Sequence, residues 1–286
     1  MTTKLSYAQI EQLRKRGFCF PIDVLSESEA DRLLLEFGRY GELVGRLGGL
    51  VAMNRYYPKP HLLAAWADRL AHNERILDAV ESVIGPDILV WATQVFVRPA
   101  HDLATLAWHQ DALYYGLEGF EDKAVRVWVA LTKTSIANGT MSYVSGSHRQ
   151  GLIEHSYTGN TKEEFMRGEE IQGDLDWQSA EPVILRAGQA AMHYLTTAHG
   201  SGSNITDQDR VNFAIDYLAP QVVPNGLEDS ALLARGEDRF GHFALERRPR
   251  TDFDGEALES FYRATTLRLR RLMQVTREKR TAASST

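Results

Sequence analysis

The sequence predicts a mainly β fold, a double-sheet barrel of the jelly-roll or cupin-like type with flanking helices. Helical patterns are concentrated before residue 87, whereas short β-branched and aromatic segments follow one another from residue 88 to about 220. Most connections between these segments are too short for the crossover helices that parallel strands need. Helices first and antiparallel strands afterwards favour a barrel with the N-terminal helices packed on one face.

The N-terminal elements are predicted from capping signals and short apolar runs. A helix is expected over 6–17, with Ser6 as its N-cap and Gly17 as its stop, and a strand is expected over 18–24. A second helix opens at Ser26 with acidic residues in its first turn, which suits the positive end of the helix dipole. Residues 60–84 are predicted to be helical as far as Gly85-Pro86.

The predicted strands share β-branched or aromatic residues bounded by Gly, Asn, Ser or Pro, and they cover 88–98, 125–134, 140–145, 182–186, 189–195 and 210–218. Alternation along two of them separates an apolar face from a polar one. Val127 and Val129 point opposite to Arg126 and Trp128, and Arg210, Asn212 and Asp216 point opposite to their apolar neighbours. A barrel that holds a ligand inside needs this separation.

We expect one domain over 1–286, with N-terminal helices in 1–87, a barrel core in 88–220 and a C-terminal helical extension in 221–286. An insertion over 152–181 is long enough to act as a lid. A late helix over 255–280 is rich in arginine, and the sequence favours a solvated face for it. Its arginines are Arg263, Arg268, Arg270, Arg271, Arg277 and Arg280.

Composition narrows the class of protein. The 286 residues carry a net charge of −6, which argues against nucleic-acid binding. The single cysteine, Cys19, excludes an intramolecular disulfide framework and suits a reducing cytoplasm. No apolar leader follows the first residues, and no run approaches the ~18 apolar residues that span a bilayer. We therefore expect a soluble, cytoplasmic protein with no membrane partner.

Two histidines and one carboxylate form the candidate metal site. On an extended segment, His109 and Asp111 point to the same side, and His199 ends an apolar strand ninety residues later. Such a facial triad binds Fe(II) and leaves coordination positions open. An arginine that follows closely, Arg210, could hold a carboxylate. Each motif alone is weak, because an HxD sequence is common in solvated loops.

Three blocks in order strengthen this interpretation. They are Trp108-His109-Gln110-Asp111, the stretch from Asn138-Gly139 to Ser145-Gly146-Ser147-His148, and His199-Gly200-Ser201 leading to Arg210. Together they resemble the phytanoyl-CoA dioxygenase-like family of Fe(II)- and 2-oxoglutarate-dependent oxygenases, from about residue 5 to 220.

The resemblance implies a double-stranded β-helix and a role for each matching residue. His109, Asp111 and His199 would bind iron, Arg210 would pair with the distal carboxylate of 2-oxoglutarate, and Ser201 would lie beside it. Trp128 would line the cosubstrate pocket. Strand parity adds Gln94, which could reach cosubstrate or substrate or could serve as a structural amide.

The expected reaction uses Fe(II), 2-oxoglutarate and O2 to hydroxylate a small metabolite or biosynthetic intermediate, as in secondary metabolism, with release of succinate and CO2. Asp111 argues against halogenation, since related halogenases have Gly or Ala there. Desaturation, epoxidation and ring formation by the same hydrogen abstraction remain open, as do a cupin-like Zn or Mn hydrolase or isomerase and a non-catalytic binding barrel.

The residues expected to contact substrate are Arg55, Tyr57, Tyr114 and Tyr115. Among the other histidines, His193 is expected to be a hydrogen-bonded core residue and His148 to brace a loop. Homo-oligomerisation is left open.

Overall fold

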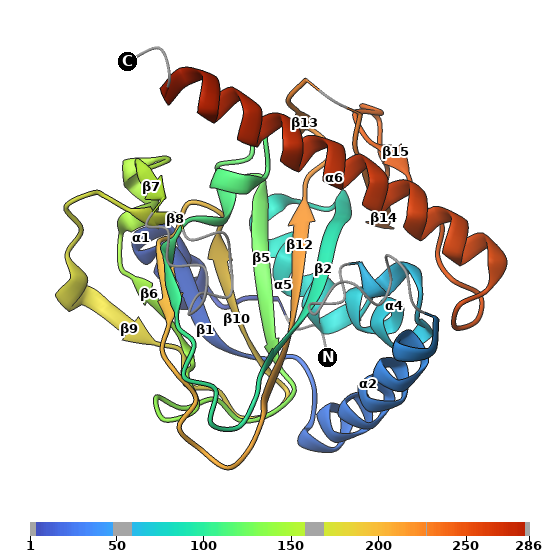
Figure 1. The fold of residues 1–286 in the computed structure, drawn as a ribbon, viewed down its shortest axis with the longest axis horizontal. Coiled ribbons are helices and arrows are strands. Elements are labelled where there is room, and N and C mark those ends of the chain that lie inside the picture. The colour runs from blue at the N-terminus through green and yellow to red at the C-terminus, as the bar shows by residue number, and fades with distance from the viewer. Residues whose placement is uncertain (1–3, 48–58, 158–168, 227, 284–286) are drawn as a thin grey trace.

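The computed structural model describes residues 4–47, 59–157, 169–226 and 228–283. Two facing sheets form the centre of the fold (Figure 1). The larger sheet has the strand order β1 (Phe18–Asp23), β10 (Gln189–Tyr194), β5 (Ala124–Ala130), β12 (Arg210–Leu218), β2 (Ile88–Arg98), β14 (Ser230–Arg235) and β15 (Ala244–Leu245). The smaller sheet has the order β3 (Leu106–His109), β11 (His199–Ser201), β6 (Met141–Val144) and β9 (Ala180–Pro182).

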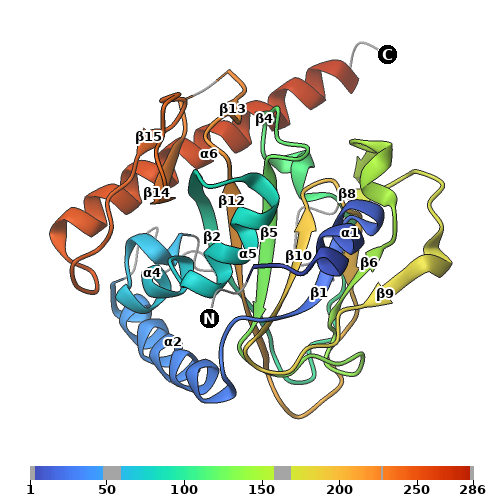
Figure 2. The same cartoon turned by 180° about the vertical axis from the view of Figure 1, so that it is seen from behind.

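The helices lie outside these sheets. They are α1 (Tyr7–Arg16), α2 (Glu27–Leu47), α4 (Ala65–Ala71), α5 (Glu74–Ile84) and α6 (Gly255–Ala283). Seen from behind, α1, α4 and α5 cover the outer face of the larger sheet, and α6 crosses the ends of its strands (Figure 2). Short 3-10 turns are η1 (Pro60–Leu62), η2 (Asp111–Tyr114), η3 (Ser147–Gln150) and η4 (Trp177–Ser179). Two small ribbons pair β13 (Val223–Pro224) with β4 (Leu117–Glu118), and β7 (His155–Tyr157) with β8 (Glu169–Ile171).

The predicted alternation of the central strands is confirmed. Val127 and Val129 of β5, with Phe213 of β12, belong to the core that packs on the helices. Trp128 and Ala214 belong instead to the core between the two sheets. Because adjacent side chains on a strand point to opposite faces, the outer face can be wholly apolar while the inner face carries the polar set.

A β-bulge alters this alternation in β2. The partner of Asp216 is Ala92, but the partner of Tyr217 is Val90, so Trp91 is the extra residue. Trp91 therefore packs with Ala92 and Tyr115 on the inner side of the sheet.

The N-terminal predictions agree with the structure. Ser6 caps α1 in a capping box with Gln9, and Gly17 ends the helix at φ 90°. The helix expected over 60–84 is divided into η1, α4 and α5, because Asn73 caps a new helix by accepting bonds from the amides of Arg75 and Ile76.

The strand expected over 182–186 is wrong in its position, since β9 ends at Pro182. Side chains satisfy the backbone that follows. The Val183 carbonyl accepts from the hydroxyls of Thr134 and Thr140, and the Leu185 amide donates to Thr134 Oγ1. The strands that were not predicted are β3, β4, β7, β8, β11, β13, β14 and β15. The part of the expected lid over 158–168 lies outside the described residues. No described helix is long and apolar enough to cross a membrane.

Gly17 provides a test of the connection between α1 and β1. Its φ is +90°, and a Cβ would lie 2.6 Å from His148 Nδ1 and 2.7 Å from Thr197 Oγ1. We expect Gly17→Ala to lower the free energy of unfolding by about 1–3 kcal/mol. Gly38→Ala in α2, where nothing lies within 4 Å of the added Cβ, should instead raise it by about 0.5–1 kcal/mol. Urea unfolding of both variants measures this difference, and equal effects would contradict the packing described.

Candidate functional site

Strand pairing brings the two predicted histidine ligands together. His109 is the last residue of β3, His199 is the first of β11, and they are directly opposite each other in the ladder. Asp111 does not lie on the strand as expected, since it begins η2. Gln110 is nevertheless extended (φ −118°, ψ 132°), so Asp111 returns to the side of His109. Possible ligand atoms of the three residues all lie within 4.8 Å of one another, and all three residues are buried.

The backbone orients both histidine rings for metal binding. His109 Nδ1 donates to the Ala107 carbonyl at 2.8 Å, and His199 Nδ1 donates to the Thr197 carbonyl at 2.9 Å. Each Nε2 therefore keeps its lone pair directed at the cluster. Burial lowers the pKa of His109 to about 3 and that of His199 to about 4, so both rings are neutral near neutral pH. Neutral imidazole is the form that binds a metal ion.

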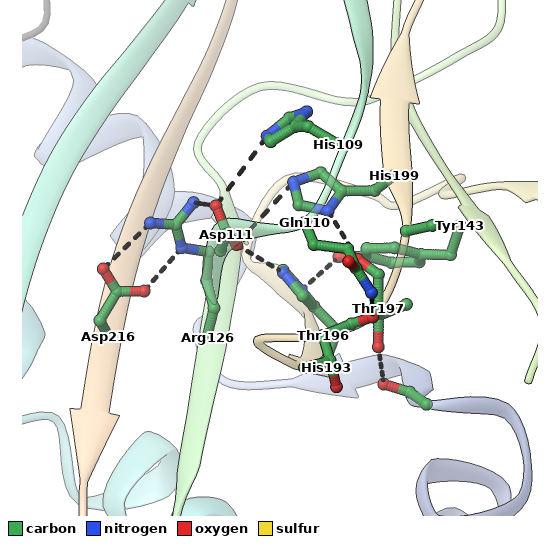
Figure 3. A network of polar contacts seen from close by, with 12 residues as sticks. His109, Gln110, Asp111, Arg126, Tyr143, His193, Thr196, Thr197, His199 and Asp216 are labelled. Atoms are coloured by element: carbon green, nitrogen blue, oxygen red, sulfur yellow. Dashed lines mark hydrogen bonds and ion pairs between the residues drawn. The ribbon is translucent and has the colours of Figure 1, made fainter. Parts of the chain in front are cut away.

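An arginine fixes the carboxylate of the triad. Arg126 of β5 donates from one nitrogen to Asp111 Oδ1 at 2.7 Å and from Nε to Asp216 Oδ1 of β12 at 2.6 Å (Figure 3). Burial opposes ionisation of Asp111, but Arg126 holds the pKa of this carboxyl well below its usual value. Tyr115 donates to Asp216 Oδ2 at 3.0 Å. Arg126 thus forms ion pairs with both Asp111 and Asp216, and it links the candidate metal site to the larger sheet.

The second oxygen of Asp111 is also held. His193 Nε2 lies 3.2 Å from Asp111 Oδ2, and Tyr143 hydroxyl lies 2.9 Å from His193 Nδ1 (Figure 3). His193 is therefore a hydrogen-bonded core residue, as predicted. His148 likewise braces a loop, since its Nε2 contacts the Arg14 carbonyl at 3.1 Å.

Gln110 ties the metal-binding turn to its surroundings. Its side-chain amide donates to the carbonyls of Thr196 and Gly151, and its oxygen accepts from the Ile153 amide. A buried glutamine with these bonds prevents the turn between His109 and Asp111 from moving independently.

A cavity of about 390 Å³ adjoins the triad. Arg210 lines it and is only 5% exposed. Its side chain donates to Asn212 Oδ1 at 3.0 Å, but its Nε has no partner among the described residues. Its guanidinium lies 5.3 Å from the centre of the Trp128 ring. Burial and the nearby charge of Arg98 lower the pKa of Arg210 to about 9. A buried cation without an acidic partner fits an anionic ligand, as the distal carboxylate of 2-oxoglutarate would supply.

Ser201 and Arg98 complete this end of the cavity. Arg98 donates to Ser201 Oγ at 2.9 Å and to the Ala104 carbonyl at 2.7 Å. The residues of the cavity therefore fit both Fe(II) and 2-oxoglutarate. Two neutral imidazoles and a carboxylate suit Fe(II), and the two arginines suit the carboxylate of 2-oxoglutarate.

The structure brings together most of the residues expected at the site. Gln94, Trp128, Ser201, Arg210, Tyr114 and Tyr115 line the cavity with the triad. Arg55 and Tyr57 lie outside the described residues. One expectation is corrected, because Arg268 of α6 lines the cavity and does not belong to a wholly solvated helix face.

Sequence reasoning did not assign Arg126, Asp216, Tyr143 or Arg98 to the site. Strand parity placed Arg126 and Asp216 on the inner face, which was the signal available for them. Tyr143 and Arg98 act through partners far along the chain, so no local pattern marks them.

The low pKa values of the two histidines make the metal-free protein sensitive to acid. A histidine whose pKa is lower folded than unfolded binds more protons when unfolded, so stability falls as pH drops below about 6.5, by about 1.4 kcal/mol per pH unit for each such group. Between about pH 7.5 and pH 5.5, His199→Gln should remove about 1.4 kcal/mol of the wild-type loss. His101→Gln is the control, because that ring is 66% exposed. Urea unfolding with a chelator measures the effect, and identical losses in all three proteins would contradict it.

Removal of Arg126 should leave two buried carboxylates without their cation. We expect Arg126→Gln to lower the free energy of unfolding by about 3–5 kcal/mol. Arg186→Gln, which removes an exposed arginine beside Asp23 and Glu27, should cost less than about 1 kcal/mol. Denaturant unfolding of both variants tests this expectation, and a small effect of Arg126→Gln would show that its charge is not needed.

Known proteins resemble this chain in sequence and in fold. The family model described as phytanoyl-CoA dioxygenase (PhyH) matches residues 13–212. The "Probable alpha-ketoglutarate-dependent hypophosphite dioxygenase" of Stutzerimonas stutzeri is 27% identical over 179 residues, which is 62% of this chain and 61% of that protein. The apo structure of ThoJ, a non-haem monooxygenase, is 50% identical with a TM-score of 0.88, covering 94% of this chain and 99% of that one.

A more distant structure agrees in fold. CytC3 with Fe(II) and alpha-ketoglutarate is 19% identical with a TM-score of 0.68, over 89% of this chain and 97% of that one. The family match covers well over half of the chain. The chain therefore belongs to the phytanoyl-CoA dioxygenase (PhyH) family and is a non-haem Fe(II)- and 2-oxoglutarate-dependent dioxygenase with a double-stranded β-helix fold.

Proposed function

We propose that His109, Asp111 and His199 bind Fe(II), and that the enzyme hydroxylates a small metabolite or biosynthetic intermediate with release of succinate and CO2. Arg210 would bind the distal carboxylate of 2-oxoglutarate, with Ser201 and Trp128 beside it. The observation that carries this assignment is one cavity that contains both a buried His-Asp-His cluster and a buried arginine without an acidic partner.

The protein's own part in the reaction is to position and to exclude water. When bound, the iron and 2-oxoglutarate supply oxidative decarboxylation with O2 and the abstraction of hydrogen from an unactivated carbon. The Ala107 and Thr197 carbonyls hold the imidazole rings in one tautomer. Arg126 keeps Asp111 ionised and turned toward the histidines. The apolar residues between the sheets keep solvent from the cluster.

Hydroxylation is the outcome we favour. Asp111 supplies the carboxylate that related halogenases lack, so no ligand position is left vacant for chloride. Desaturation, epoxidation or ring formation would begin with the same hydrogen abstraction, and the identity of the substrate would decide among them. The hydrolase or isomerase alternative would make no use of Arg210, so the site supports it less.

The substrate would lie in the part of the cavity lined by Gln94, Tyr114 and Tyr115. These side chains combine aromatic surface with hydrogen-bonding groups, as binding pockets for small molecules commonly do. Other expectations stay predictions: a single domain over 1–286, a cytoplasmic location and the question of homo-oligomers.

Anaerobic titration of the metal-free protein with Fe(II) and then 2-oxoglutarate tests the proposal. Wild type should develop the weak visible charge-transfer band of the iron–2-oxoglutarate chelate, and His199→Ala should not. Arg210→Gln should need about 30-fold more 2-oxoglutarate for the same band, since loss of a buried charged partner costs about 2 kcal/mol or more. Arg186→Gln, at an exposed site, should titrate as wild type. A wild type that binds Zn(II) or Mn(II) but forms no band with Fe(II) and 2-oxoglutarate would contradict the proposal.

A further inference from the structure

One arginine of the C-terminal helix faces the cavity. Phe261 and Ala264 of α6 are buried, and Arg268 follows them at helical spacing, on the same side of the helix. Arg268 is partly buried and lines the same cavity as the triad. By contrast, Arg263 is exposed and pairs with Glu228, and Arg270 is exposed. Arg268 therefore differs from the solvated arginines beside it.

Arg268 lies at the end of the cavity away from the cosubstrate arginines. Its guanidinium is 5.1 Å from the centre of the Trp91 ring on β2. Arg98, which belongs with Arg210 and Ser201, is seven residues further along the same strand, or roughly 20 Å of extended chain. Figure 1 shows α6 crossing the ends of β5, β12 and β2. A ligand in this part of the cavity would meet Arg268 on the side opposite Arg210.

Among the described residues, no carboxylate or other acceptor forms a hydrogen bond or ion pair with the Arg268 side chain, which lies over the face of Trp91 and near Tyr115. Two of the other arginines that line the cavity have an acidic partner: Arg126 pairs with Asp216, and Arg98 lies 3.7 Å from Asp102. The two charges of Fe(II) and that of Arg210 would be offset by 2-oxoglutarate and Asp111. Among the described residues that line the cavity, no negative charge then remains to balance the positive charge of Arg268.

The surroundings of Arg268 define what would neutralise it. Trp91, Tyr114 and Tyr115 belong to one aromatic cluster at this end of the cavity. A guanidinium that lies over an aromatic face still presents the N–H groups of its edge, whose planar fork matches a carboxylate or a phosphate. The complementary ligand has an anionic group attached to an apolar body.

We propose that Arg268 binds a carboxylate or phosphate group of the primary substrate and thereby selects anionic substrates. The inference rests on the proposed function, because it assigns the substrate end of the same cavity. Arg268 lies outside the stretch 13–212 that the family model matches, so this selectivity belongs to the C-terminal extension of the chain.

Isothermal titration calorimetry with matched ligand pairs tests the proposal. The protein is kept anaerobic with Fe(II) and saturating 2-oxoglutarate, so that Arg210 is occupied. The probes are phenylacetate against phenylacetamide, which differ in charge but hardly in shape, and phenyl phosphate as the alternative anion. Wild type should bind at least one of the two anions about tenfold more tightly than the amide, and the tighter anion identifies the preferred group.

Substitutions test whether this preference for anions depends on Arg268. Arg268→Gln should reduce it to about twofold or less, and Arg268→Lys should keep part of it because the charge remains. Arg270→Gln, two residues further along α6, should keep all of it. Thermal unfolding checks that each variant is folded.

Three results would overturn the inference: equal binding of anions and amide by wild type, binding of none of them, or an unchanged preference in Arg268→Gln. The charge-transfer band separates this failure from a failure of the proposed function. If the band forms but charge makes no difference, only the role of Arg268 is lost. If no band forms, the proposed function fails first.

Discussion

A buried chain of charges, Asp216–Arg126–Asp111, connects the larger sheet to the turn of the candidate metal site. Arg126 and Asp216 are cross-strand partners on β5 and β12, so the sheet itself fixes the position of the guanidinium. Asp111 lies on a 3-10 turn and forms no strand pairing. Its ion pair with Arg126 therefore fixes the position of its carboxylate relative to the larger sheet. Without the cation, two carboxylates would be buried without compensation, which is far more costly than the loss of an exposed ion pair. The geometry of the triad therefore depends on this interaction.

The two faces of the larger sheet have different roles: one packs on the helices, and the other faces the cavity. Its outer face is mainly apolar and packs on α1, α4 and α5, which stabilises the fold chiefly by burial of apolar side chains. Its inner face holds Trp128 and three charged residues, Arg126, Arg210 and Asp216. The charged groups would be costly to bury unless they were paired or met a ligand. The bulge at Trp91 adds an aromatic ring to the inner face at the end where α6 crosses. The ligand site thus lies where the sheet does not need apolar packing.

The smaller sheet contributes the histidines through very short strands. β3 has four residues and β11 has three, yet their pairing places His109 opposite His199. Elements this short are not distinguishable from loops by periodicity, which is why β3 was not predicted. Its role was still foreseen, because the motif at its end is chemically specific even when its conformation is not.

The sequence by itself determined the fold class, the positions of most principal strands along the chain, the inner and outer faces of β5 and β12, and the three residues of the candidate metal site. These depend on local alternation and on motif chemistry, both of which are properties of neighbouring residues. Only the tertiary structure decided that Arg126 and His193 hold the two oxygens of Asp111, that Arg98 accompanies Ser201, and that Arg268 reaches the cavity. Each of these contacts joins residues on different elements, so its existence depends on strand register and on where α6 crosses the sheet, which no local pattern encodes.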